Sequence, residues 1–146
     1  MNPKLEDGSL SLSQPSVIRV LIVEDFQPFR EFVCSTVAER PDLQVIAEVS
    51  DGLEAVQKAV ELKPDLILLD IGLPTMNGIE AARRIRALVP NAKIIFLSCE
   101  TSADVVEEAF SLGALAYVQK ANARRQLLAA IDAVILGQRF DPNSTH

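Results

Sequence analysis

The sequence has little of the residues that build most metal sites and nucleophilic triads. Histidine occurs once among the 146 residues, as the final residue His146. This argues against a histidine-based metal site, a Ser-His-Asp triad and a phosphohistidine carried in a folded core. Cysteine occurs twice, at Cys34 and Cys99. Two cysteines are too few for a disulfide scaffold and fit a reducing compartment, so we expect a cytoplasmic protein.

Positive charge and long apolar runs are also scarce. The chain has 14 Lys and Arg against 20 Asp and Glu, a formal charge of -6, which argues against non-specific binding to DNA or anionic membranes. No apolar run reaches the roughly 20 residues that cross a bilayer. Residues 1–16 lack the apolar region of a secretory signal. We expect no direct nucleic-acid binding by this chain and no membrane association.

What the chain does contain is an alternation between β-branched runs and helical periodicity. The patterns predict strands at 17–23, 43–49, 65–69, 93–97 and 114–118. They predict helices at about 27–39, after Asp51-Gly52, after Asn77-Gly78, around Val105–Phe110 up to Gly113, and at about 122–136. The second helix is expected to bury Ala55, Val56, Ala59 and Val60. Gly137 is a candidate C-cap.

Five successive βα units predict the fold class and the domain organisation. Continuous apolar strands separated by helices indicate a parallel sheet covered on both faces. Right-handed crossovers then give an α/β doubly wound five-stranded sheet flanked by helices. We expect a flexible N-terminal arm over 1–16, one folded domain over 17–138 and a loose C-terminal tail over 139–146.

Charged and hydroxyl side chains stand directly after four of the predicted strands. Glu24 and Asp25 follow the first strand, Asp70 the third, Ser98 the fourth and Lys120 the fifth. Ligands of open parallel α/β sheets bind beyond the carboxyl ends of the strands. We therefore expect these five side chains to meet at one edge of the sheet.

A helix cap is the common structural role of an acid after a strand. Ser50-Asp51-Gly52, after the second strand, is typical of a plain turn. The joint placement of three other acids with a serine and a lysine favours chemistry. Clustered carboxylates repel one another, and Mg²⁺ (or Mn²⁺) relieves this with oxygen ligands. A carboxylate can also form an acyl phosphate, while a lysine and a hydroxyl bind phosphoryl oxygens. The sequence therefore predicts a divalent-metal and phosphoryl site.

The residues around these positions resemble a known family, the bacterial two-component response regulator receiver domain, over about residues 17–140. The resemblance rests on the motifs Val23-Glu24-Asp25, Leu69-Asp70-Ile71-Gly72-Leu73-Pro74 with Asn77-Gly78, Leu97-Ser98, and Ala116-Tyr117-Val118-Gln119-Lys120. The sequence is most similar to the NarL/FixJ type. The resemblance implies a flavodoxin-like sheet of strand order 2-1-3-4-5 and a phosphorelay signalling protein rather than an enzyme, one that assists its own phosphorylation and dephosphorylation.

The resemblance also implies metal-binding and phosphoacceptor roles. Asp70 would accept a phosphoryl group from a sensor histidine kinase or a phosphotransfer protein. Asp25, Asp70 and the backbone carbonyl of Gly72 would ligate Mg²⁺, with Glu24 acting through water. Lys120 would pair with the phosphoryl group.

Further positions would switch the surface or tune the phospho-form. The family pattern implies that Ser98 moves to bind the phosphoryl group while Tyr117 shifts inward. The resemblance assigns Gly72, Cys99 and Glu100 to tuning access and lifetime. Gly72 has no side chain to place an attacking water, which predicts a long-lived phospho-form. Cys99 either narrows access to Asp70 or is a plain small hydrophobe. The sequence leaves the geometry of the Lys120–Ala121 peptide bond open.

The output and the assembly are left with alternatives. The chain is either a stand-alone receiver that acts by protein contact or the N-terminal receiver fragment of a helix-turn-helix transcription factor. A homodimer would use the last two helices with the fifth strand, or the first and last helices. A non-phosphorylated pseudo-receiver is a further alternative. An aspartyl phosphatase of the haloacid dehalogenase type is disfavoured, because Gly72 stands where it needs a second acid, and both nucleotide-binding glycine motifs are absent.

Overall fold

The computed structural model describes residues 17–99 and 102–141. The predicted arm over 1–16 lies outside the described residues. Strands and helices alternate in the order expected from the sequence. In chain order they are β1 (Ile18–Val23), α2 (Gln27–Ala38), β2 (Leu43–Val49), α3 (Gly52–Leu62), β3 (Leu66–Asp70), α4 (Gly78–Leu88), β4 (Lys93–Ser98), α5 (Ala103–Ser111), β5 (Ala116–Gln119), the 3₁₀ turn η1 (Lys120–Asn122) and α6 (Ala123–Ile135).

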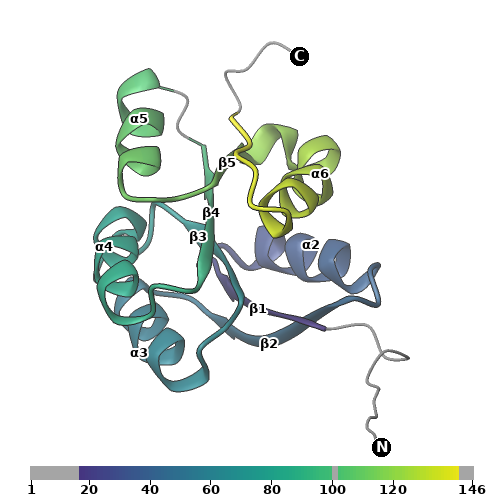
Figure 1. Ribbon diagram of the computed structural model, residues 1–146, viewed down its shortest axis with the longest axis horizontal. Helices are drawn as coiled ribbons and strands as arrows, with labels where there is room; N and C mark the ends of the chain where they lie inside the picture. The colour runs from purple at the N-terminus through teal and green to yellow at the C-terminus, as the bar shows by residue number, and fades with distance from the viewer. Residues whose placement is uncertain (1–16, 100–101, 142–146) are drawn as a thin grey trace, which may run out of the picture.

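The five strands form one parallel sheet in the order β2-β1-β3-β4-β5 (Figure 1). This confirms the predicted doubly wound architecture. The chain first winds from β1 outward to β2, then crosses back to β3 and continues to β5. The direction of winding therefore reverses between β1 and β3, and the carboxyl ends of these two strands flank the crevice where such sheets bind ligands.

Helices cover both faces of the sheet, and the strand alternation decides which residues face which layer. Helices α3, α4 and α5 lie on one face, and α2 and α6 lie on the other (Figure 1). In β3, Ile67 and Leu69 pack toward the first layer, while Leu66 and Leu68 pack toward the second. All four side chains are at most 1% exposed. This two-sided burial is why the strand reads as an unbroken apolar run.

Side-chain caps begin three of the helices. The carboxylate of Asp51 accepts a hydrogen bond from the Glu54 N–H at 2.7 Å at the start of α3. Asn77 and Ser102 cap α4 and α5 in the same way. Each cap satisfies an N–H group that has no partner within the helix. The acid after β2 therefore serves as a helix cap, where the sequence had predicted a plain turn.

Glycine ends the last helix. Gly137 has φ +79°, and its N–H donates to Val134 O, while the Gln138 N–H donates to Ala133 O. This pair of bonds is the Schellman arrangement, which requires a left-handed residue just after the helix. The predicted role of Gly137 at the end of α6 is thereby confirmed.

The segment after α6 departs from the expectation of a loose tail. Phe140 forms a parallel bridge with Ala116 at the outer edge of β5. Its N–H donates to Leu115 O at 2.8 Å, and its carbonyl accepts from the Tyr117 N–H at 3.2 Å. The guanidinium of Arg139 lies 3.8 Å from the centre of the Phe110 ring on α5. Residues 139–141 therefore lie along the sheet edge, and 142–146 fall outside the described residues.

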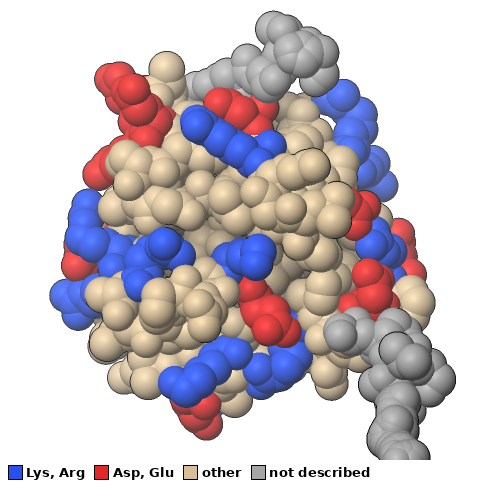
Figure 2. Space-filling view, viewed as in Figure 1, with Lys and Arg blue, Asp and Glu red and all other residues tan. Residues whose placement is uncertain are grey.

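Charges of both signs are interspersed over the face in Figure 2. Two of the three arginines of α4 are paired with acids: Arg83 and Arg84 contact Glu80, and Arg83 also lies 3.7 Å from Glu108 on α5. These pairs are exposed, so each adds little to stability. Within the described residues, no helix is both long and apolar enough to cross a bilayer.

Candidate functional site

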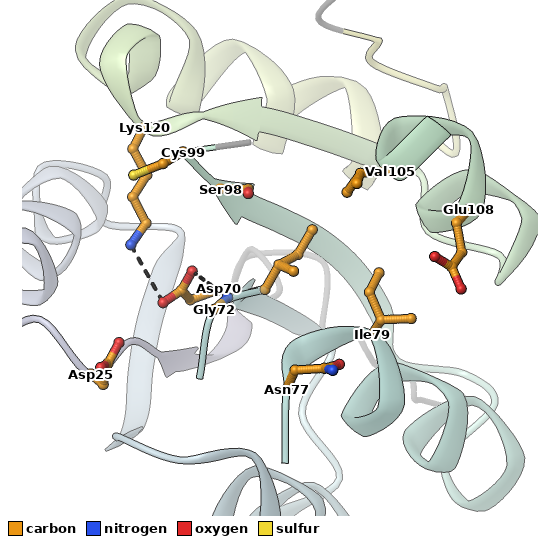
Figure 3. Close-up of a pocket in the computed structure, with 11 residues that line it drawn as sticks. Asp25, Asp70, Gly72, Asn77, Ile79, Ser98, Cys99, Val105, Glu108 and Lys120 are labelled. Carbon is orange, nitrogen blue, oxygen red and sulfur yellow. Dashed lines mark hydrogen bonds and ion pairs between the residues drawn. The ribbon is translucent and has the colours of Figure 1, made fainter. Parts of the chain in front are cut away.

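Strand register brings the predicted residues to one edge of the sheet. Three pairs define this edge: Val23 with Leu69, Asp70 with Leu97, and Ser98 with Gln119. Glu24 and Lys120 each follow the last paired residue of their own strand. The side chains that the sequence placed after separate strands therefore lie near Asp70. Figure 3 shows Asp25, Ser98 and Lys120 among them. Asp70 itself is the last residue of β3, one residue further into the strand than predicted.

Asp70 is a buried carboxylate with partners on both oxygens. The residue is 3% exposed. Its Oδ1 accepts a hydrogen bond from the Gly72 N–H at 3.1 Å, and its Oδ2 lies 3.4 Å from the ammonium of Lys120. Burial, and after it the charge of Glu24, raise the pKa of Asp70 to about 6, against the opposing effects of Lys120 and the Gly72 N–H. The carboxylate is still ionised near pH 7, which a nucleophile requires.

Lys120 is held mainly by Glu24. Its ammonium lies 2.9 Å from Glu24 Oε1 and donates to Oε2 at 3.0 Å. Glu24 is fully buried, and its Oε2 also accepts from the Phe26 N–H. Burial lowers the pKa of Lys120, but the carboxylates of Glu24 and Asp70 outweigh it and hold that pKa above its usual value. The lysine is therefore a fixed positive charge beside the phosphoacceptor candidate.

Three carboxylates gather closely enough to share a cation. Ligand atoms of Glu24, Asp25 and Asp70 all lie within 4.8 Å of one another. Asp25 is exposed, and both Asp25 and Asp70 line the cavity above the sheet edge. The oxygen donors suit a hard divalent cation such as Mg²⁺. Because Lys120 already pairs with Glu24, Asp25 and Asp70 are the carboxylates best placed to ligate.

An open cavity of about 500 Å³ lies over these groups. Its charged end contains Asp25, Asp70 and Lys120, and its other end runs between α4 and α5. Figure 3 shows the side chains of both ends converging on this space. The lining residues are Asp25, Asp70, Ile71, Gly72, Asn77, Ile79, Ser98, Cys99, Val105, Glu108 and Lys120. Its size and opening leave room for a phosphoryl group together with a hydrated cation.

The predicted switch residues lie on adjacent strands. Ser98 ends β4, is 4% exposed and lines the cavity. Tyr117, on β5, is fully buried in the core beneath α3–α5. The side chain therefore already lies inward in this structure. Cys99 is exposed at the cavity, whereas Glu100 falls outside the described residues. The Lys120–Ala121 peptide bond is trans.

The loop after Asp70 is tightly folded against the site. The Gly78 N–H donates to Ile71 O at 2.8 Å, and a Cβ on Gly78 would collide with the Asp70 carbonyl. Only glycine lets the start of α4 approach the acceptor strand this closely. At Gly72, in contrast, an added Cβ would meet nothing within 4 Å. The loop therefore tolerates side chains at Gly72 but not at Gly78.

Residues 20–132 match the family described as the response regulator receiver domain. The chain belongs to this family of two-component signalling domains. Its members generally bind Mg²⁺ at an acidic cluster, which here corresponds to Glu24, Asp25 and Asp70. Domains of this family serve mostly in signalling rather than in catalysis.

Curated relatives include transcriptional regulatory proteins and a chemotaxis protein. The transcriptional regulatory protein LiaR of Bacillus subtilis is 38% identical over 122 residues, which cover 84% of this chain and 58% of LiaR. The chemotaxis protein CheY of Listeria monocytogenes is 36% identical over 116 residues, covering 80% of this chain and 97% of CheY. The chain thus spans just over half the length of LiaR but nearly all of CheY.

Solved structures agree with the predicted subfamily. A LuxR-family response regulator from Aurantimonas has a TM-score of 0.81 and 34% identity, covering 86% of this chain and 89% of that one. The receiver domain of the NarL regulator from Mycobacterium tuberculosis has a TM-score of 0.80 and 26% identity, covering 85% and 100%. These matches confirm the NarL/FixJ-like resemblance and the flavodoxin-like strand order.

Two residues of the site were missed from the sequence. The ammonium of Lys120 lies 5.0 Å from the centre of the Phe29 ring on α2, a cation–π distance. Arg30, also on α2, donates from Nη1 to the carbonyl of Glu24 at 2.9 Å. Both lie in the first turn of the helix that follows the acidic pair. That proximity in sequence is the one signal that could have indicated them.

Proposed function

We propose that this receiver domain accepts a phosphoryl group on Asp70 from a phosphohistidine of a partner kinase or phosphotransfer protein. The observation that carries the proposal is the setting of Asp70. It is the buried carboxylate that lines the open cavity, with Lys120 at 3.4 Å and the exposed acid Asp25 beside it. Asp51, the acid after β2, caps a helix instead.

The transfer requires a nucleophilic carboxylate and charge neutralisation. An oxygen of Asp70 forms a bond to phosphorus while the bond from phosphorus to the donor imidazole nitrogen breaks. The imidazole leaves with the electron pair and is then protonated. Lys120 supplies positive charge to the phosphoryl oxygens. Mg²⁺ held by Asp25, Asp70 and the backbone carbonyl of Gly72 would supply further neutralisation of those oxygens.

A surface switch would follow from the new charge. The hydroxyl of Ser98 donates to a phosphoryl oxygen, and Tyr117 responds in the space beside it. The two residues occupy adjacent strands, and Tyr117 packs against the layer of α3–α5. The local event would thereby alter the surface formed by α5, β5 and α6.

Three residues, Gly72, Cys99 and Glu100, are proposed to tune the lifetime of the phospho-form and access to Asp70. Gly72 offers no side chain to place an attacking water, which favours slow hydrolysis of the phospho-form. Cys99 lies at the cavity and is the candidate for narrowing access to Asp70. Glu100 is likewise proposed to influence how long the phosphoryl group lasts.

Family membership suggests two kinds of partner, a phosphoryl donor and an output partner. A sensor histidine kinase or phosphotransfer protein is the donor, in line with the LuxR-family relatives. The output is either contact with another protein, as for a stand-alone receiver, or control of an attached DNA-binding domain. Homodimer formation would use the α5–β5–α6 face or the α2–α6 face. This chain itself makes no direct contact with nucleic acid in either arrangement.

Binding of a phosphoryl mimic tests the proposal. The protein is titrated with beryllofluoride in the presence of Mg²⁺, and amide chemical shifts are recorded. We expect saturable shifts at Asp70, Ser98 and Lys120, and none of these in Asp70→Asn. Asp65→Asn, at the opposite end of β3, is the matched control and should respond like the wild type. A wild type without shifts would contradict the assignment.

A further inference from the structure

The exposed acid of the site, Asp25, differs from its neighbour Glu24 in its side-chain contacts with the described residues. Among the described residues, no hydrogen bond or ion pair holds the carboxylate of Asp25. Its neighbour Glu24 is in the opposite situation, since its carboxylate is paired with Lys120. The position of the Asp25 carboxylate is therefore set by the backbone that carries it, at the turn from β1 into α2.

That backbone is held on both sides of Glu24. The Glu24 N–H donates to the carbonyl of Val49 on β2 at 3.0 Å. The Glu24 carbonyl, which belongs to the peptide unit that leads directly into Asp25, accepts from Arg30 Nη1 at 2.9 Å. A guanidinium is a rigid planar donor, and a hydrogen bond from a charged group is stronger than a neutral one.

Arg30 is itself oriented by a second contact. Its Nε lies 3.5 Å from Oε1 of Glu48 on β2, and its side chain is 22% exposed. The residue therefore ties three elements together: α2, which carries it, the end of β1, and β2. Of the side chains described, Arg30 is the one that contacts the peptide unit leading into Asp25.

We propose that Arg30 is a positioning residue for the divalent cation of this site, acting through the peptide that joins Glu24 to Asp25. The proposal rests on the proposed function, because it assumes that Asp25 ligates the cation. Losing the guanidinium frees the carbonyl and widens the range of positions that the Asp25 carboxylate samples. Cation affinity falls because ordering the ligand then costs conformational entropy.

Arg19 offers a matched control, because it lies at the start of β1, whereas Glu24 and Asp25 follow the end of that strand. Arg19 on β1 also donates from Nη1 to a backbone carbonyl at 2.9 Å, that of Lys63. Arg19 lies five residues before Glu24, near the amino end of β1, whereas the site lies beyond its carboxyl end. Arg19→Gln removes the same kind of bond and the same charge without touching the turn that carries Asp25.

The test measures binding of Mg²⁺ alone. Wild type, Arg30→Gln, Arg30→Lys and Arg19→Gln are titrated with MgCl₂ while amide chemical shifts are recorded. Removing groups that orient a metal ligand typically weakens binding about 10–100-fold. Since Arg30 acts on the backbone and is partly exposed, we expect a dissociation constant about three- to tenfold higher for Arg30→Gln. Arg30→Lys, which keeps a charged donor, should lie in between, and Arg19→Gln should equal the wild type.

A second readout separates positioning from general damage. The initial rate of phosphorylation by acetyl phosphate is followed against Mg²⁺ concentration. In Arg30→Gln the half-saturating concentration should rise while the rate at saturating Mg²⁺ stays near that of wild type. If Arg30→Gln does not fold, Arg30→Lys carries both measurements, with a smaller rise expected.

Two results would overturn the role of Arg30, and a third, distinguishable result would contradict the proposed function. Equal dissociation constants for wild type and both Arg30 variants would overturn the role of Arg30. An equal loss in Arg19→Gln would also overturn it, because the effect would then be one of general charge. Failure of the wild type to bind Mg²⁺ would instead contradict the proposed function itself.

Discussion

At the scale of single residues, the three carboxylates of the site differ in burial and in the groups they contact. Three acids followed strands in the predicted pattern, but the structure gives them different surroundings. Glu24 is fully buried and paired with Lys120, Asp70 is buried at the cavity, and Asp25 is exposed. The sequence could predict their meeting, because register follows from the strand pattern. It could not predict the pairing of Glu24 with Lys120, which depends on side-chain directions across 96 residues of chain.

The raised pKa of Asp70 predicts a pH-dependent stability. In the folded protein the pKa is about 6, whereas an unfolded aspartate titrates near 4. Between these values the folded state binds the proton more tightly, so stability falls as pH rises through this window. At pH 7, without metal, Asp70→Asn removes the cost of the buried charge and should stabilise the protein by about 1–3 kcal/mol.

Urea unfolding in EDTA across about pH 4 to 7 measures this effect. The advantage of Asp70→Asn should be largest at pH 7 and should be small near pH 4, where folded Asp70 is neutral and the unfolded aspartate is about half protonated. Added Mg²⁺ should stabilise the wild type more than the variant, because Asp70 is a proposed ligand. An advantage that does not change with pH would contradict the assigned cause.

Gly72 gives a residue-scale prediction about the phospho-form. An added side chain there would meet nothing within 4 Å, so the fold should accept Gly72→Asn. The amide can place an attacking water near Asp70, so the variant's phospho-form should decay several times faster than that of wild type. Decay of the phosphorylated species after removal of the donor is the measurement. Faster decay of the wild type would contradict the expectation of a long-lived phospho-form.

At the scale of helices and strands, most of the architecture follows from periodicity. The errors come from contacts that no local pattern encodes. Val60 was expected to be buried, yet it is 41% exposed, because it lies past the edge of the stripe formed by Ala55, Val56 and Ala59. The fifth strand begins at Ala116 rather than at 114, and Lys120 opens a 3₁₀ turn. Short edge elements depend on their neighbours more than on propensity.

The segment that follows α6 gives an element-scale prediction. Phe140 is half-buried and packs against the α2–α6 layer, and its carbonyl accepts the N–H of Tyr117. Phe140→Ala should cost about 1–2 kcal/mol, less than truncation of a fully buried phenylalanine. It should also speed hydrogen exchange at the Tyr117 amide. Urea unfolding and exchange measured by NMR test the two effects.

Leu136→Ala is the control for this segment. Leu136 is 72% exposed at the end of α6, so its truncation should change stability by less than about 0.5 kcal/mol and leave Tyr117 exchange unaltered. Unchanged exchange at Tyr117 in Phe140→Ala would contradict the claim that the Phe140 side chain anchors the backbone contact along β5.

At the scale of the whole molecule, one feature of the fold explains the site. A parallel sheet of order β2-β1-β3-β4-β5 brings the carboxyl ends of β1, β3, β4 and β5 to one edge. Residues that are separated along the chain thus gather around Asp70, and the two apolar layers fix the strands that carry them. This arrangement was predictable because each strand had its own apolar run and its own terminal polar residue. The partner, in contrast, has no signature within these residues.

The central claim is that Asp70 is the phosphoacceptor, and site-mapped mass spectrometry tests it most directly. The protein is incubated with acetyl phosphate and Mg²⁺, and intact mass and peptide masses are recorded for wild type, Asp70→Asn and Asp65→Asn. The account predicts one phosphoryl group on the peptide that contains Asp70, labile to base, dependent on Mg²⁺, retained in Asp65→Asn and lost in Asp70→Asn. A modification that persists in Asp70→Asn, or none in the wild type, would contradict it.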